Sequence, residues 1–565
     1  MRLRAFTGPL IAVLALCLLA TACSSDPDTS FSASSDTDNS QLGDSDASGD
    51  SGVTEFSGDG QTATSIPELA FIDGPRTLRV GLPTLDFVAP HELDETDPSA
   101  VLVTDLLTDG LTELNSFSGL IEPALAESWD VSPDGLTWTF ALGEYSFSDG
   151  TPITAADVVT SLERVAVRGI GSLSGPTLWP IVGWVDINAA DSEVETGSIV
   201  PGLVAVDERT VEINLTEPFA ALPDVLAGVV FGIYPAEPAG ADDLPMASSR
   251  DFEPVALWED GVRVQRIDDA DEARIGVVEL YIDDEGTLLE AGEVDMTIDL
   301  DPSDPLRDLR SSLSPRAAHV FFAMDATEAP FDDPLIRQAV LHAVDMEAIR
   351  SQHFPNDLLM RSFGGLVGDN RDNCALACEL DLDEAQLLVD ASTSGDVGFT
   401  VDYFGLPAAE DAGDDAKSIE QRVAEVVAEQ LQALGLDATA QGHEPAEYGT
   451  LAATGELDLF LFGSVTTAPT PEATVAALFG SFGYDNITGT SIDRLDELIA
   501  EARDEQNGEL RRADYASAEQ VAFGEGVVLP LVTLQHHVRF TDQLRAAGLE
   551  PDGSLDLNAI EFANG

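Results

Sequence analysis

Hydrophobic and polar positions recur with two different periods along this chain, so the sequence predicts both strands and helices. Leu136, Trp138, Phe140 and Leu142 alternate with small polar residues, which predicts a half-buried strand. Further strands are expected at 76–81, 210–215 and 457–462. Apolar residues spaced by three and four positions predict helices at 101–107, 154–162, 334–350, 418–434, 493–503 and 510–523. Strands and helices mixed in this order indicate α/β domains.

The length and composition are those of a folded protein with several domains. The chain has 565 residues, which suggests three or four domains or one large multi-lobed unit. Hydrophobic residues make up 44% of it, and the mean hydropathy is +0.04. A chain of this composition can bury a core, so a wholly disordered protein is excluded.

The charge is strongly negative. Lysine and arginine number 26 against 103 aspartate and glutamate residues, a net charge of −77, and Lys417 is the one lysine. Such a surface repels phosphates, which argues against nucleic-acid partners. Two explanations stay open, solubility in high salt and a cationic partner, and we favour salt adaptation.

The N-terminal residues predict export and lipid anchoring. Arg2 and Arg4 precede an apolar stretch from Pro9 to Ala20 that is short for a bilayer span, which is typical of a cleaved signal over residues 1–22. Small residues then lead into Cys23, and this resembles the lipobox of bacterial lipoproteins, in which the cysteine is lipidated. An ordinary secretory signal is the alternative. Residues 23–74 are rich in Ser, Asp and Gly and predict a disordered acidic linker.

Three stretches of the body resemble one protein family. They are Ile121-Glu-Pro-Ala-Leu-Ala-Glu-Ser-Trp129, Val131-Ser-Pro-Asp-Gly-Leu-Thr-Trp-Thr-Phe140 and Phe147-Ser-Asp-Gly-Thr-Pro-Ile-Thr-Ala-Ala-Asp-Val158. They are similar to the family 5 extracellular solute-binding proteins, the oligopeptide, dipeptide and nickel-binding components of ABC importers. Most of the matched residues belong to turns and core strands, so they identify the fold and leave the ligand open.

The resemblance implies an α/β fold of two lobes, the type II periplasmic-binding-protein fold, with an extra N-terminal subdomain. We expect lobe I at 75–118, 208–316 and 523–565, the subdomain at 119–207, and lobe II at 317–522. The implied function is capture of a peptide or other small solute by lobe closure and its delivery to ABC permease subunits. We expect a monomer on the outer face of the cytoplasmic membrane, held by its lipid, with neither cofactor nor enzymatic activity. A solute-sensing receptor or scaffold of the same fold is the alternative.

The resemblance also implies candidate ligand-binding residues. In peptide-binding members a Gly-Trp-…-Asp motif follows the strand that matches 457–462, and its Asp pairs with the ligand's α-ammonium. Here Ser464 replaces the Trp and Thr467 replaces the Asp, so either peptides are bound differently or an acid elsewhere serves. Asp325 stands where the family has an Asn. The full candidate set is Phe322, Asp325, Phe404, Ser464, Thr466 and Thr467. Core packing is the alternative for the two phenylalanines.

Two cysteines lie close together in the body, Cys374 and Cys378. Outside the cytoplasm we expect them to form a disulfide. A metal site or free thiols are the alternatives, but none of the seven histidines is near in sequence, so we expect no metal.

The lipobox generates a direct prediction for Cys23. Replacing it by serine (Cys23→Ser) removes the thiol that carries the lipid, so acyl labelling should be lost and lipoprotein-type signal cleavage blocked. Metabolic labelling with palmitate measures this. Label that persists in the variant would contradict lipid attachment at Cys23.

Overall fold

The computed structural model describes the body of the chain. It covers residues 76–563 apart from 86–87, 94, 96, 116–119, 169–173, 188–198, 236–246, 251, 259–260, 268–274, 284–285, 299–309, 314–317, 354–359, 362–378, 396, 409–416, 466–469, 484–485, 535–536, 547, 549–553 and 558. The predictions for residues 1–74, including Cys23, and for Cys374, Cys378, Thr466 and Thr467 lie outside the described residues.

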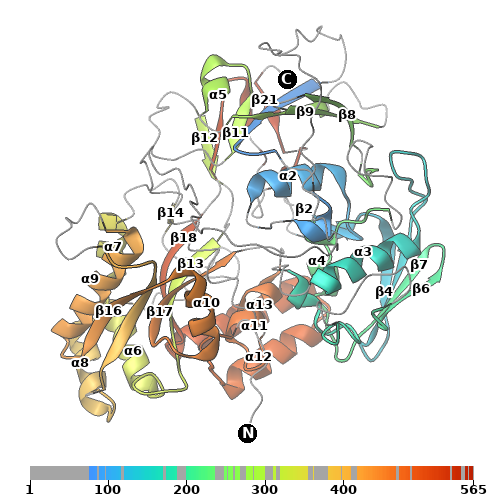
Figure 1. The fold of residues 1–565 in the computed structure, drawn as a ribbon. Coiled ribbons are helices and arrows are strands. Elements are labelled where there is room, and N and C mark those ends of the chain that lie inside the picture. Colours follow the sequence, from blue (N-terminus) through green and yellow to red (C-terminus); the bar gives the residue numbers. More distant parts are fainter. Residues whose placement is uncertain are drawn as a thin grey trace, which may run out of the picture. The chain divides into compact units, whose positions relative to one another are not determined.

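The first β-sheet along the chain has seven strands, in the order β12-β19-β11-β1-β10-β9-β8. Its strands are β1 (Arg76–Leu82), β8 (Phe252–Trp258), β9 (Gly261–Arg266), β10 (Ile275–Ile282), β11 (Met296–Ile298), β12 (Arg310–Leu313) and β19 (His537–Phe540). Apolar residues of β1, β8, β9, β10, β11 and β19 pack in one core with Leu102, Val103 and Leu106 of helix α2 (Pro98–Leu107), which lies beside the sheet in Figure 1.

A four-stranded antiparallel sheet, β4-β5-β7-β6, forms a separate core with helix α3 (Ala155–Arg168). Its strands are β4 (Ala126–Val131), β5 (Thr137–Leu142), β6 (Leu203–Asp207) and β7 (Thr210–Asn214). The predicted alternation in β5 is confirmed, since Trp138 and Phe140 are buried. The predicted start of α3 is also confirmed, because Asp157 Oδ2 accepts hydrogen bonds from the backbone N–H of Thr154 (2.9 Å) and from its hydroxyl (2.6 Å).

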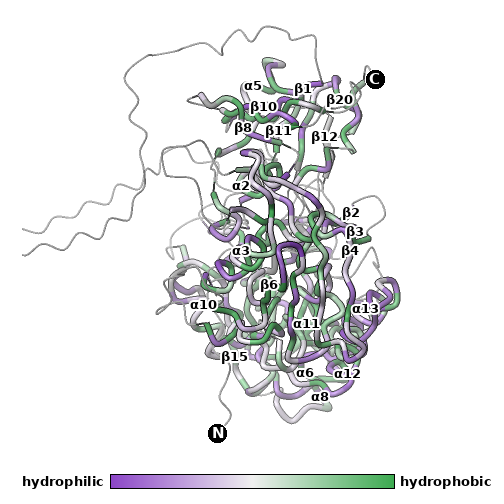
Figure 2. Tube along the Cα trace, turned by 90° about the vertical axis from the view of Figure 1, so that its right-hand side faces the viewer, coloured by the Kyte–Doolittle hydropathy of each residue, from purple (hydrophilic) through white to green (hydrophobic). Residues whose placement is uncertain are grey.

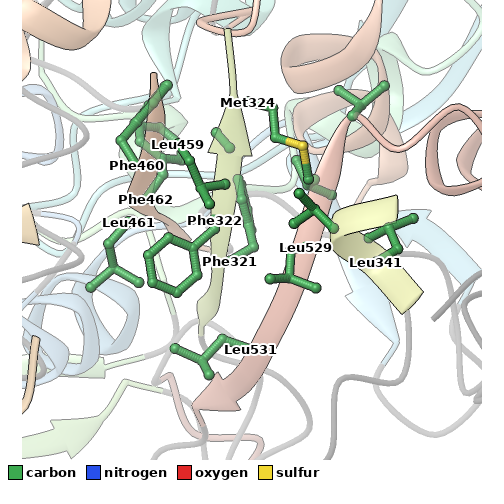
Figure 3. Close-up of a cluster of buried hydrophobic side chains, with 14 of the residues drawn as sticks. Phe321, Phe322, Met324, Leu341, Leu459, Phe460, Leu461, Phe462, Leu529 and Leu531 are labelled. Carbon is green, nitrogen blue, oxygen red and sulfur yellow. The ribbon is translucent and has the colours of Figure 1, made fainter. Parts of the chain in front are cut away.

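A six-stranded sheet, β14-β18-β13-β17-β15-β16, carries the largest hydrophobic core. Its strands are β13 (Ala318–Met324), β14 (Met360–Arg361), β15 (Phe399–Phe404), β16 (Ala438–His443), β17 (Leu459–Val465) and β18 (Val528–Leu534). The core includes side chains from β13, β17 and β18, which Figure 3 shows together. The helices of this part are α6 (Pro334–Ala343), α7 (Met346–His353), α8 (Leu382–Ala391), α9 (Ile419–Ala433), α10 (Pro445–Thr454), α11 (Val475–Phe479), α12 (Asp493–Asp504) and α13 (Gly508–Gly524).

Shorter elements complete the described part. They are η1 (Pro90–Glu92), β2 (Thr112–Asn115), β3 (Leu120–Pro123), η3 (Gly175–Leu178), α4 (Leu222–Val225), η4 (Val229–Phe231), α5 (Thr287–Ala291), η6 (Pro471–Ala473), β20 (Leu544–Ala546) and β21 (Glu561–Phe562).

The helix predicted over 334–350 is two helices in the structure. Val344 has an extended backbone at the end of α6, and the Oδ1 atom of Asp345 accepts a hydrogen bond from the N–H of Ala348 at 2.9 Å. Asp345 therefore serves as a side-chain cap for a new helix, α7. Apolar spacing alone did not reveal this break, because the buried positions continue across it.

The chain passes between the seven-stranded and six-stranded sheets at two places among the described strands. It crosses between Leu313 of β12 and Ala318 of β13, and it returns between Leu534 of β18 and His537 of β19. The sequence-based division places β18 in lobe I, whereas its ladder with β13 places it in the six-stranded sheet. It likewise places β7 in lobe I, whereas β7 pairs with β5 and β6.

Helices α12 and α13 are largely hydrophilic in Figure 2 and bury one face each, partly through ion pairs. Arg503 of α12 binds Glu472 (2.6 Å) and Glu217 (3.3 Å), and its guanidinium lies 5.4 Å from the centre of the Trp179 ring. The Glu472 side chain is 3% exposed and also accepts a hydrogen bond from the Tyr515 hydroxyl. These contacts join α12 and α13 to segments near residues 179 and 217, which are distant in sequence.

A second ion pair lies at the same junction. Arg511 of α13 contacts Asp224 of α4 at 2.6 Å, and the N–H of Ala220 donates to the carbonyl of Arg503 at 2.8 Å. Burial raises the pKa of the Asp224 carboxyl, and the charge of Arg511 opposes that shift. Both cations therefore neutralise carboxylates that are largely shielded from water.

We predict that Arg503→Met destabilises the protein by about 3–5 kcal/mol, because Glu472 is left as a buried carboxylate without its cation. Urea unfolding at neutral pH measures the loss. Arg494→Met on the same helix is the matched control, since Arg494 pairs with Glu497 in an exposed contact (56% and 65% exposed). That loss should stay below about 1 kcal/mol. Equal losses in the two variants would contradict a structural role for the buried pair.

Candidate functional site

The carboxyl ends of parallel strands mark a candidate binding site in each large sheet. In the six-stranded sheet β15 runs parallel to β16 and β17, with Phe404 opposite His443. Val465, near the same edge, pairs with Ala318, and Ala318 pairs with Leu534, so this edge is where the chain crosses to the other sheet. Ligands of α/β sheets characteristically bind at the carboxyl ends of parallel strands.

The seven-stranded sheet presents its own carboxyl edge to the same crossovers. Strand β1 runs parallel to β10 and β11. Ile298, the last residue of β11, pairs with Val538, and Leu313 of β12 pairs with His537. The two carboxyl edges therefore both lie where the chain passes between the sheets, and we take them as the candidate site.

A buried carboxylate supports the edge of the six-stranded sheet. Asp402 of β15 is 1% exposed, and its Oδ1 lies 2.7 Å from Nε2 of His443, the last residue of β16. Its Oδ2 accepts hydrogen bonds from the Thr400 hydroxyl (2.6 Å) and from the N–H of Asp458 (3.1 Å). The His443 side chain is 12% exposed, so Asp402 holds a partly accessible imidazole at the edge.

Burial raises the pKa of the Asp402 carboxyl, and the hydrogen bonds from Thr400, His443 and the backbone of Asp458 act in the opposite direction. Tyr448 of α10 also lies beneath this edge, and its hydroxyl donates to the carbonyls of Leu461 (2.8 Å) and Asp402 (3.2 Å). This arrangement fixes the imidazole of His443 as a polar group at the edge of the sheet.

Two of the residues predicted from sequence lie at this edge. Phe404 is half-buried at the end of β15, and its ring packs edge-on against Tyr448 with centroids 6.0 Å apart. Ser464 lies opposite His319 near the end of β17. The structure therefore brings Phe404 and the strand containing Ser464 to one edge, although a ligand contact by either stays a prediction.

Phe322 and Asp325 lie elsewhere. Phe322 is fully buried, in register with Leu461, and packs inside the hydrophobic core, as Figure 3 shows. Phe322 therefore lies where the core-packing alternative expects it, among buried apolar side chains. Asp325 follows Met324, which pairs with Leu459 at the opposite end of the ladder from the Ala318–Val465 pair. The ladder is seven residues long and spans about 20 Å, so Asp325 does not lie beside Ser464.

Asp325 has a local role in the structure. Its Oδ1 accepts hydrogen bonds from the N–H of Thr327 (2.9 Å) and from the Thr327 hydroxyl (2.6 Å). Such a contact stabilises a turn. The expectation that Asp325 joins the other candidates around one cleft therefore finds no support in this geometry.

Sequence reasoning did not identify the Asp402–His443 pair. The two residues are 41 positions apart and share no motif. The parallel pairing of β15 with β16 in the structure is what brings the ends of both strands to one edge. Without the register, either residue resembles any other polar residue in an acidic chain.

The described part offers neither a metal site nor a membrane-spanning helix. No group of three His, Cys, Asp or Glu side chains there is placed to hold a metal ion. Nor does any helix in that part have the length and apolar character needed to cross a bilayer.

Comparison with known proteins identifies the family. The model of the bacterial extracellular solute-binding proteins, family 5, matches residues 121–486. A probable peptide ABC transporter periplasmic-binding protein, y4tO of Sinorhizobium fredii, is 27% identical over 349 residues, which cover 54% of this chain and 60% of that protein. The dipeptide-binding protein DppE of Bacillus subtilis is 24% identical over 481 residues, covering 80% of this chain and 86% of that protein.

A solved structure shows the same fold. The periplasmic murein tripeptide-binding protein MppA in its unliganded open form superposes with a TM-score of 0.69 at 18% identity, covering 86% of this chain and 97% of that chain. The predicted two-lobed α/β fold is confirmed.

The site generates a prediction for Asp402. Asp402→Ala removes the acceptor of the Asp458 N–H and the partner of His443, and each buried group left unpaired costs about 1–3 kcal/mol. Urea unfolding measures the loss, and Asp402→Asn, which keeps an oxygen acceptor, should lose less. An Ala variant as stable as the wild type would contradict the structural role of this carboxyl.

The same variants test the raised pKa. A carboxyl with a higher pKa in the folded state than in the unfolded chain takes up its proton first in the folded state as the pH falls. The wild type therefore gains stability relative to Asp402→Asn on acidification and loses that advantage as the pH rises through the raised pKa. A stability difference that does not change with pH would contradict the shift.

Proposed function

Because the chain belongs to the family 5 bacterial extracellular solute-binding proteins, we propose that it captures a peptide or other small solute between its lobes and delivers it to an ABC permease. The observation that carries the proposal is the placement of both parallel-strand carboxyl edges at the interlobe crossovers. A solute held by both edges stabilises the closed arrangement of lobes joined by short connections. The work is binding and closure, without bond chemistry.

The lobes follow the sheets in this proposal. Lobe I comprises the seven-stranded sheet with α2, and the subdomain comprises the four-stranded sheet with α3 and includes β7. Lobe II comprises the six-stranded sheet and includes β18, so the return crossing falls between Leu534 and His537. Two crossings close together are the arrangement a hinge requires.

We propose that the protein works outside the cytoplasm as a monomer, anchored by a lipid on Cys23. The apolar stretch and the small residues before Cys23 support this, and residues 24–74 provide a polar tether. A diacyl anchor is strong enough to hold a protein at the membrane surface while the folded body reaches a permease.

The residue at position 467 supports a proposal for the class of ligand. Relatives are named for peptides, as in the dipeptide-binding protein DppE. In this chain Thr467 replaces the acid that meets the α-ammonium in peptide-binding members, and Asp325 lies at the far end of its strand. A buried ammonium without a counter-charge costs about 3–5 kcal/mol, or two to three decades of affinity. We therefore propose that ligands without a free α-amine are preferred, such as blocked peptides or sugars.

We predict that di- to pentapeptides with free amines bind more weakly than about 1 μM, and that the same peptides bind at least as tightly when N-acetylated. Isothermal titration calorimetry on the mature protein measures both series. Tight binding of the free-amine series that is lost on acetylation would contradict the prediction, and would show that another acid binds the ammonium.

Variants at position 467 sharpen this test. Thr467→Asp should improve binding of free-amine peptides by about two decades, because it supplies the missing charge. Thr467→Asn is the matched control, since it has nearly the same shape without the charge and should bring no such gain. Equal affinities for the two variants would show that residue 467 does not face the ligand's amine.

A further inference from the structure

We propose that a pocket between η1 and α3 binds a small oxyanion, such as sulfate, phosphate or a carboxylate group. The pocket has a volume of about 420 Å³ and is lined by His91, Glu92, Arg164, Val167 and Arg168. None of these residues belongs to the candidate solute site, so this inference goes beyond the proposed function.

Arg168 supplies a positive charge that no carboxylate neutralises among the described residues. Its Nη1 donates to the carbonyl oxygens of His91 (2.6 Å) and Leu93 (2.8 Å), and the described part contains no ion pair to it. Carbonyls orient a guanidinium but do not cancel its charge, and three of its five N–H donors remain on Nε and Nη2. In a chain with 103 acidic residues and only 26 lysines and arginines, a cation held in this way is notable.

A chain of hydrogen bonds makes His91 a donor toward the pocket. Arg164 lies over the ring of Tyr234 at 4.5 Å and hydrogen-bonds its side chain. The Tyr234 hydroxyl lies 2.6 Å from Nδ1 of His91. In the arrangement that we propose, the Tyr234 hydroxyl donates to Nδ1, and the neutral imidazole carries its own proton on Nε2.

The charge state of His91 agrees with this arrangement. Burial, Arg164 and Arg168 lower the pKa of His91 to about 4, so the ring is neutral at pH 7. Among the described residues, the charged and titratable groups around it are Arg164, Arg168, Tyr234 and Glu92. An anion beside His91 and the two guanidinium groups would offset their positive potential, so it would raise this pKa on binding.

The carboxylate of Glu92 opposes anion binding, so replacing Glu92 tests whether the pocket binds anions. Its side chain is 65% exposed, and Oε1 lies 4.0 Å from His91 Nε2, which is beyond hydrogen-bond distance. A carboxylate at the rim repels an incoming anion. Glu92 therefore sets an upper limit on affinity, and its removal should strengthen binding.

The competing explanation is that Arg168 only fastens the backbone of η1 to α3 through its two carbonyl contacts. Under that explanation Arg168→Gln loosens η1. Glu92→Gln changes nothing, because the hydrogen bond of Glu92 within η1 comes from its backbone N–H, which donates to the carbonyl of Ala89 at 2.7 Å and is kept in the variant. Under our proposal the two variants shift anion affinity in opposite directions. The pair therefore separates an anion site from a purely structural contact.

The experiment follows the imidazole resonances of His91 by NMR in the mature protein. Sodium sulfate, sodium phosphate and sodium acetate are titrated separately against sodium chloride at matched ionic strength, which controls for general salt effects. We expect a saturable shift of His91 with at least one oxyanion, accompanied by a rise in its pKa, while His443 at the candidate solute site stays unchanged. The sulfate and acetate series distinguish a tetrahedral from a planar ligand.

The variants decide the outcome. For the oxyanion that binds, Arg168→Gln should weaken affinity about tenfold or more, and Glu92→Gln should strengthen it severalfold. A shift that never saturates, that chloride reproduces, or that is identical in the wild type and Arg168→Gln would overturn the proposal. Unchanged affinity in Glu92→Gln would also overturn it.

Discussion

The register between β13 and its two neighbours is the constraint on which the rest of the structure depends. Ala318 lies opposite Val465 and Leu534, so the strands that connect the sheets and the last residues of β17 meet at one edge. Val320 to Met324 are all buried, so β13 packs on both faces, and a shift of one residue would exchange the side chains that each face receives. The position of the candidate site and the integrity of the core are therefore set by the same hydrogen-bond ladder.

Several of the few cations in this chain neutralise buried carboxylates. Arg503 and Arg511 neutralise carboxylates at the junction of α12 and α13 with residues 217–224, and Arg263 binds the buried Glu279 between two strands at 2.5 Å. An acidic surface suits a salt-rich environment, but buried carboxylates need a counter-charge even there, because salt does not reach them. Arg168 differs, since in the described part its contacts are carbonyls.

Much of the fold could be predicted because its signals are local. The alternation at 136–142, the capping pair Thr154 and Asp157, and the apolar spacing of 418–434 each depend on neighbours within a few residues. The domain boundaries were harder to predict. The strand β7 was predicted from sequence, yet only pairing across the fold decides which sheet β7 and β18 join.

The sequence by itself determined the family, the two-lobed α/β fold, the acidic character and the loss of the expected Trp and Asp at Ser464 and Thr467. Only the tertiary structure decided which polar residues share an edge. It paired Asp402 with His443 across 41 positions and separated Asp325 from the crossover edge by the length of β13. The physical reason is that sequence motifs report local backbone geometry, whereas a binding site is assembled by strand register between segments far apart in the chain.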